Sequence, residues 1–177
     1  MTKKAVTTGL VGFGLGYALW RAYEAGMDRA WRGFFGSPDL GPVDFAALVR
    51  RPTPNDALAC PPSMCPGAKA DIDAPVYPVP AAGLRAVIAQ AAASEPNTVL
   101  IGSTETQDRF LVRTRLMRFP DTVVAQVFER GEGTSTLALY SRSQIGRSDL
   151  GVNLRRLKHW LGRIDALAGG GQASSGR

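Results

Sequence analysis

The distribution of proline constrains this chain more than any other feature of its sequence. Ten of the twelve prolines lie between Pro38 and Pro80. Because proline lacks a backbone N–H and fixes φ, this stretch is excluded from regular helix and from the centre of a sheet. We therefore predict a stiff, extended connector over residues 37–73, with one short helical turn capped by Asp44. The connector leads into a single compact domain over residues 74–168.

The first 23 residues are typical of a signal anchor or a transmembrane segment. Lys3 and Lys4 precede an uncharged run from Ala5 to Trp20, which is the layout of an export signal. No small-residue cleavage motif follows the run, so we expect the segment to be retained as a membrane anchor. Small residues recur at helical spacing in this segment, at Gly9, Gly12 and Gly16. They would let a second membrane helix approach closely. The alternative is that glycine is simply tolerated at these positions.

Residues 24–36 predict an amphipathic helix at the membrane interface. Apolar and aromatic residues recur at helical spacing around this segment, at Tyr23, Met27, Trp31, Phe34 and Phe35. Trp and Tyr prefer the depth of the lipid headgroups, and arginines meet lipid phosphates. The alternative is that the same stripe packs on the domain or on a partner protein.

The domain is predicted to be α+β, with an antiparallel sheet of four to five strands packed on two helices in the order β-α-β-β-β-β-α. Four segments rich in β-branched and aromatic residues are separated by short turns, at residues 97–105, 108–119, 122–130 and 135–143. No connection between them is long enough for a parallel crossover. In the second segment we expect one mostly apolar face and one face that carries arginine. The first comprises Phe110, Val112, Thr114 and Leu116, and the second comprises Arg109, Leu111, Arg113, Arg115 and Met117.

The last helix, predicted over residues 150–167, covers that apolar face of the sheet. Its apolar stripe comprises Leu150, Leu154, Leu157, Leu161 and Ile164. The residues expected to face away are Arg155, Arg156, His159 and Arg163. The glycine-rich and serine-rich tail, residues 169–177, is predicted to be disordered.

Charge and cysteine content restrict the classes of partner. The formal net charge is +6 and comes mainly from arginine, which suits a basic surface or anionic lipid headgroups. Nucleic acid is not favoured, because no RNA-binding motif or zinc-finger spacing is present. Cys60, Cys65 and the sole histidine cannot complete a four-ligand zinc site, so we expect no metal and no cofactor. The two cysteines either form a disulfide in an exported domain or remain free thiols.

A polar string joins the last predicted strand to the last helix. It concentrates hydroxyl, guanidinium, carboxylate and amide groups where a strand meets a helix N-terminus, an arrangement that can bind an anion, a headgroup or a peptide terminus. These candidate ligand-binding residues are Ser141, Arg142, Ser143, Arg147, Ser148, Asp149 and Asn153. The structural alternative is that Ser148 or Asp149 caps the helix and that Gly146 permits an unusual turn.

This string, together with RPTPNDALACPPSMC upstream and the PDT turn between two strands, resembles the bacterial and plastid family catalogued as domain of unknown function 1499. The match runs from about Arg51 to Ile164. The resemblance implies domain boundaries and no settled activity. Where the family pattern often has an aromatic residue after the glycine, this chain has Arg147.

We therefore expect a membrane-anchored, non-catalytic binding or assembly module in the bacterial inner membrane, with its domain facing the periplasm. Its expected partners are membrane lipid, a lipid-like or anionic ligand, or an integral-membrane protein. The alternative is an envelope hydrolase or transferase that uses the polar string. No catalytic residue is predicted, because a G-x-S-x-G elbow is absent and His159 falls on a basic helix face.

Overall fold

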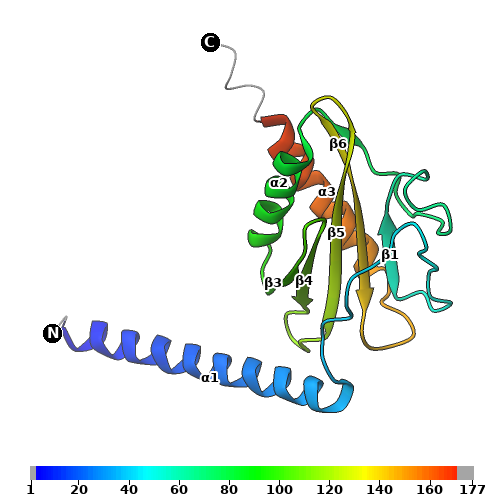
Figure 1. Ribbon diagram of the computed structural model, residues 1–177. Helices are drawn as coiled ribbons and strands as arrows, with labels where there is room; N and C mark the ends of the chain where they lie inside the picture. The colour runs from blue at the N-terminus through cyan, green and yellow to red at the C-terminus, as the bar shows by residue number, and fades with distance from the viewer. Residues whose placement is uncertain (1–2, 171–177) are drawn as a thin grey trace, which may run out of the picture.

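The fold is α+β, as predicted, and is built on one antiparallel sheet. The computed structural model describes the backbone of residues 3–170 and the side chains of residues 15–169. Figure 1 shows its elements in order: α1 (Lys3–Phe35), β1 (Asp56–Ala59), β2 (Val76–Tyr77), α2 (Ala81–Ala93), β3 (Thr98–Ser103), β4 (Gln107–Arg113), β5 (Pro120–Gly131), β6 (Thr134–Ser143) and α3 (Val152–Gly170). From β2 onward the order is the predicted β-α-β-β-β-β-α.

The sheet is six-stranded, with the order β1-β6-β5-β4-β3 and with β2 also paired to β6. Consecutive hairpins join β3 to β6, since their turns are too short for any other connection. β1 and β2 both lie along β6, where Asp56 is opposite Arg142 and Val76 is opposite Thr136. The predicted sheet of four to five strands thus gains β1, a strand that the sequence did not indicate.

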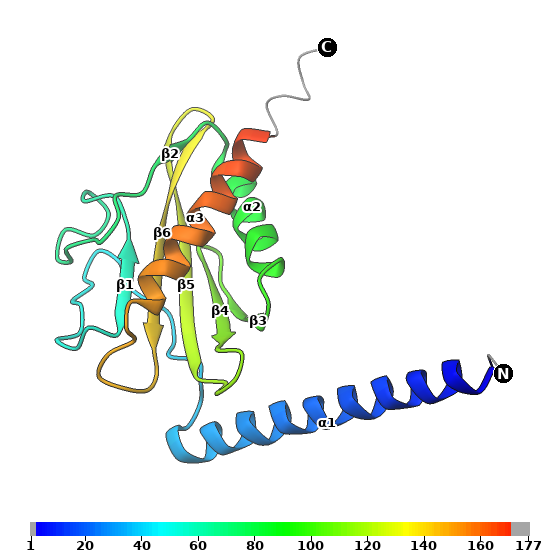
Figure 2. The ribbon, with the colours of Figure 1, turned by 180° about the vertical axis from the view of Figure 1, so that it is seen from behind.

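Helices α2 and α3 lie side by side on one face of the sheet, as Figure 2 shows from behind. The alternation of β4 is as predicted, because Phe110 and Val112 both point into this helical layer. The Phe110 ring meets the buried Trp160 of α3 edge-on, with 5.5 Å between ring centroids. This layer is the main core, and burial of its large side chains supplies most of the driving force for folding.

The predicted connector over residues 37–73 is instead a second layer of the domain. Within it, β1 joins the sheet, and the disulfide-bonded loop and the turn capped by Asp44 cover the face opposite the helices. The buried side chains of this layer include Val43, Phe45, Leu58, Cys60 and Cys65, which cluster with Tyr140 of β6. Proline excludes regular helix and central strand, but it does not prevent a chain from burying apolar residues in irregular backbone. The compact unit therefore begins well before residue 74.

The N-terminal region is one continuous helix, α1, without the predicted boundary between residues 1–23 and 24–36. It crosses the end of the sheet beneath the β4–β5 turn, and its N-terminal half projects past the sheet (Figure 1). Among the helices formed by residues 3–170, none is both long enough and apolar enough to cross a membrane. Tyr23 and Trp31 of the predicted stripe contact the domain, which is the second of the two alternatives that the sequence left open. Phe34 and Phe35 of the same stripe are exposed.

Four details predicted for the C-terminal half were wrong. Strand β4 ends at Arg113, so Leu116 is 64% exposed, and residues 114–118 form a turn in which Arg118 has a φ of 54°. Helix α3 begins two residues later than predicted, so Leu150 is 83% exposed instead of facing the sheet. Arg156 turns inward because it pairs with Asp121. The helix continues to Gly170, and the rest of the predicted tail, residues 171–177, lies outside the described residues.

Candidate functional site

The polar string surrounds a buried hydrogen-bond network at the N-terminus of α3. The Asn153 side chain is fully buried at its centre, where its Nδ2 donates to Ser143 Oγ at 3.0 Å. Its Oδ1 accepts from Ser141 Oγ at 2.5 Å and from Arg156 Nη1 at 2.6 Å. Both polar ends of the amide are therefore satisfied, as a buried amide requires. Three of the candidate ligand-binding residues thus hold β6 and α3 together.

Two residues that the sequence did not single out complete this network. Asn55, just before β1, accepts from Asn153 Nδ2 through its backbone oxygen at 3.1 Å and donates to the Gly146 carbonyl at 2.7 Å. Asp121, at the start of β5, accepts from Arg156 Nη2 at 2.6 Å. The signal for both was in the family resemblance, since Asn55 lies in the upstream string and Asp121 in the PDT turn.

Asp149 caps α3, which is the structural alternative that the sequence offered. Its Oδ1 accepts from the Gly151 N–H at 2.9 Å and its Oδ2 from the Asn153 N–H at 2.7 Å. Ser148 makes a longer contact of the same kind, in which its Oγ accepts from the Leu150 N–H at 3.3 Å. The carboxylate of Asp149 satisfies N–H groups at the start of the helix and complements the helix dipole.

The two arginines of the string lie apart from this network. Arg142 points to the opposite face of the sheet, where it donates to the carbonyls of Leu40 and Gly41 at 2.8 and 2.9 Å. Burial there lowers the pKa of the Arg142 guanidinium. Arg147 is exposed on the loop before α3. The structure therefore does not gather the guanidinium groups of the string into one anion site.

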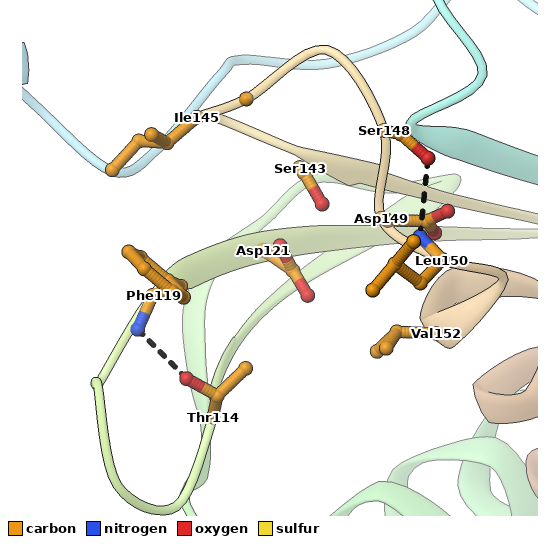
Figure 3. A pocket seen from close by; sticks show the side chains of 10 residues that line it. Thr114, Phe119, Asp121, Ser143, Ile145, Ser148, Asp149, Leu150 and Val152 are labelled. Atoms are coloured by element: carbon orange, nitrogen blue, oxygen red, sulfur yellow. Dashed lines mark hydrogen bonds between the residues drawn. The ribbon is translucent and has the colours of Figure 1, made fainter.

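A pocket of about 320 Å³ opens beside the network, between the β4–β5 turn and the loop that leads into α3 (Figure 3). Asp121 and Ser143 lie next to each other there, with Phe119 and Leu150 on either side. Most of the exposed wall is apolar. The lining residues are Thr114, Phe119, Asp121, Ser143, Ile145, Gly146, Ser148, Asp149, Leu150 and Val152.

Helix α1 supports one wall of this pocket. The Trp31 ring of α1 packs on Phe119, with 5.0 Å between centroids, and Trp31 Nε1 donates to the Met117 carbonyl at 2.7 Å. Tyr23 donates its hydroxyl hydrogen to the Leu116 carbonyl, also at 2.7 Å. Both donors therefore fix the backbone of the turn that carries Phe119.

A cluster of buried charges reinforces this contact between α1 and the turn. Arg118 is 8% exposed, and its guanidinium binds Glu24 Oε1 at 2.7 Å and both oxygens of Asp28, at 2.9 and 3.0 Å. Arg113 lies 3.2 Å from Asp28, and burial lowers the pKa of its guanidinium. Such a fork matches a carboxylate in both charge and geometry. We call these four residues the α1 latch.

The glycines proposed to meet a partner helix lie in α1. A side chain added at Gly16 would have no atom within 4 Å, so this face of the helix is open. Gly9 and Gly12 also belong to α1, but their surroundings lie outside the described residues.

The two cysteines form a disulfide, Cys60–Cys65, which closes the loop after β1. A disulfide that closes so short a loop stabilises the fold by about 2 kcal/mol, because it lowers the conformational entropy of the unfolded chain.

We predict that Cys60→Ala/Cys65→Ala lowers the free energy of unfolding, measured in urea, by about 2 kcal/mol. We also predict that alkylation of the denatured wild-type protein adds mass only after reduction. Labelling without reductant would show two free thiols instead.

A match to one family model relates the chain to known proteins. No curated protein matches the chain. One family model, described as "Protein of unknown function (DUF1499)", matches residues 51–164. This range contains both halves of the buried network, Asn55 at one end and Asn153 at the other. The chain therefore belongs to this family.

Proposed function

We propose that the protein is a non-catalytic binding module of the cell envelope that takes a small lipid-like ligand in the pocket beside α3. The observation that carries the proposal is a mostly apolar pocket with Asp121 and Ser143 among its lining residues. Its volume of about 320 Å³ lies at the lower end of the roughly 300–1,000 Å³ typical of small-molecule sites. A ligand with an apolar body and one polar end fits this distribution.

The polar end of the ligand is best matched by a hydroxyl or an amine. The charged side chains of the lining are the carboxylates of Asp121 and Asp149, and carboxylates accept hydrogen bonds. The nearby guanidinium of Arg156 is already paired with Asp121. These contacts favour a lipid-like ligand over an anionic one.

The hydrogen bonds of the site favour binding over hydrolysis. Asp149 already accepts two backbone hydrogen bonds, one on each oxygen, and so serves as a helix cap. His159, the sole histidine of the chain, contacts Glu95 at 2.9 Å instead of a serine of the string. A hydroxyl nucleophile needs a base within hydrogen-bond reach.

A location in the cell envelope is supported by two further features. The disulfide of the second layer suits an oxidising compartment. The exposed apolar residues at the free half of α1 suit contact with a membrane, and they include Leu15, Tyr17, Leu19 and Trp20.

The test is mass spectrometry of the intact protein, purified in mild detergent from its own membranes. We expect a bound small molecule at a stoichiometry near one, and we expect Ile145→Trp, which fills the pocket, to lose it. Val49→Trp, an exposed position outside the pocket, is the matched control and should retain the molecule. Wild-type protein that carries a recurrent integral-membrane protein but no ligand would overturn this proposal and support an assembly role.

A further inference from the structure

The α1 latch separates the charges of α1 by sign. Glu24 is 7% exposed and points at Arg118, and Asp28 is held between Arg118 and Arg113. Both carboxylates of this part of the helix therefore pair with arginines of the domain, and the second oxygen of Glu24 also pairs with Arg21 of α1 at 2.9 Å. The helix keeps its basic side chains on the outside, since those of Arg29 and Arg32 are exposed.

The loops at the same end of the molecule carry the same charge. Arg115 is exposed in the β4–β5 turn, which α1 contacts directly. Arg147 is exposed in the loop before α3. Gln144 of the same loop donates to the carbonyls of Phe35 and Ser37 at the C-terminal end of α1. Four exposed arginines thus surround the end of the sheet that α1 crosses.

Exposed apolar side chains lie among these arginines. Leu116 and Met117 are exposed at the tip of the β4–β5 turn, and Leu150 is exposed at the rim of the pocket. On α1 the exposed apolar residues include Leu15, Tyr17, Leu19, Trp20, Phe34 and Phe35. In both ribbon views α1 runs across this end and extends past the sheet (Figures 1 and 2). The surface is extended rather than enclosed, and a helix of this length spans about 50 Å.

We propose that this basic and apolar surface docks on an anionic lipid bilayer, with the mouth of the pocket close to the lipid. Trp, Tyr and Leu side chains insert at the depth of the lipid headgroups, and arginine side chains bind the lipid phosphates. A surface that carries both kinds of side chain therefore matches the interface of an anionic bilayer. Each arginine near an anionic surface strengthens binding by about 1 kcal/mol. The docking surface is independent of the pocket, but exchange of a ligand with the bilayer rests on the proposed function.

The test is cosedimentation of the full-length protein with vesicles of pure phosphatidylcholine or of phosphatidylcholine with about a third phosphatidylglycerol. We expect much tighter binding to the anionic vesicles, and weakening of that binding as salt screens the charges. Arg29→Gln/Arg32→Gln/Arg115→Gln should weaken it by about a hundred-fold, because three favourable charges are removed.

The matched control removes three positive charges elsewhere on the surface, with Lys69→Gln/Arg130→Gln/Lys158→Gln, and should change binding by less than three-fold. Equal binding to neutral and anionic vesicles, or an equal effect of the two triple variants, would overturn the proposal. Ile145→Trp should still bind vesicles, and the arginine triple variant should still retain the pocket ligand. Failure of one proposal is thereby distinguished from failure of the other.

Discussion

Asn153→Ala is expected to lower the free energy of unfolding by about 3 kcal/mol. The substitution removes an amide that is fully buried and hydrogen-bonded at both ends. It leaves the Ser141 and Ser143 hydroxyls and the Arg156 guanidinium short of partners inside the protein, which costs more than the lost bonds themselves. For a domain of this size the melting temperature should fall by roughly 10 °C.

Ser148→Ala is the control for Asn153→Ala, because Ser148 belongs to the same string but is exposed. It should change the free energy of unfolding by less than about 0.5 kcal/mol. Thermal unfolding followed by circular dichroism measures both variants. If both variants lowered the free energy of unfolding by a similar small amount, the buried network would not be what holds the polar string in place.

Arg118→Met should release α1 from the end of the sheet. The variant removes the Arg118 guanidinium from Glu24 and Asp28, which keep only Arg21 and Arg113. Breaking a buried ion pair from one side costs about 3–5 kcal/mol. The ratio of docked to undocked helix should therefore fall by at least a hundred-fold. Hydrogen exchange followed by mass spectrometry should show lost protection in residues 20–35 and in the turn over residues 114–119.

Two further variants test the mechanism of this release. Arg115→Met removes an exposed arginine from the same turn and should leave exchange unchanged. Adding Glu24→Gln/Asp28→Asn to Arg118→Met should restore part of the protection, because the two carboxylates that lost the Arg118 guanidinium no longer carry charge. The added substitutions could instead leave the loss of protection unchanged. That result would show that packing of Trp31 on Phe119, and not charge, holds the helix.

The sequence by itself determined the part of the fold that depends on local periodicity. Alternation along residues 109–117 predicted the apolar face of β4 correctly as far as Val112, where the strand is about to end. Helical spacing predicted the buried stripe of α3 through Leu157, Leu161 and Ile164. Short turns required an antiparallel arrangement of β3 to β6. The capping role of Asp149 was also open to sequence reasoning, because a cap and its helix are adjacent in the chain.

Only the tertiary structure decided which segments far apart in the chain meet. Proline indicated where regular structure stops, but not that Phe45 and Leu58 cover the second face of the sheet. Nothing local to Asn55 shows that it bonds a residue 98 positions later, nor that Arg118 binds Asp28 across 90 positions. Such partners share no periodicity along the chain, and polar residues near them in sequence are equally able to remain in water. These residues pair because the folded sheet brings their backbones together and buries their polar groups. A buried polar group without a hydrogen-bond partner lowers stability far more than one left in solvent.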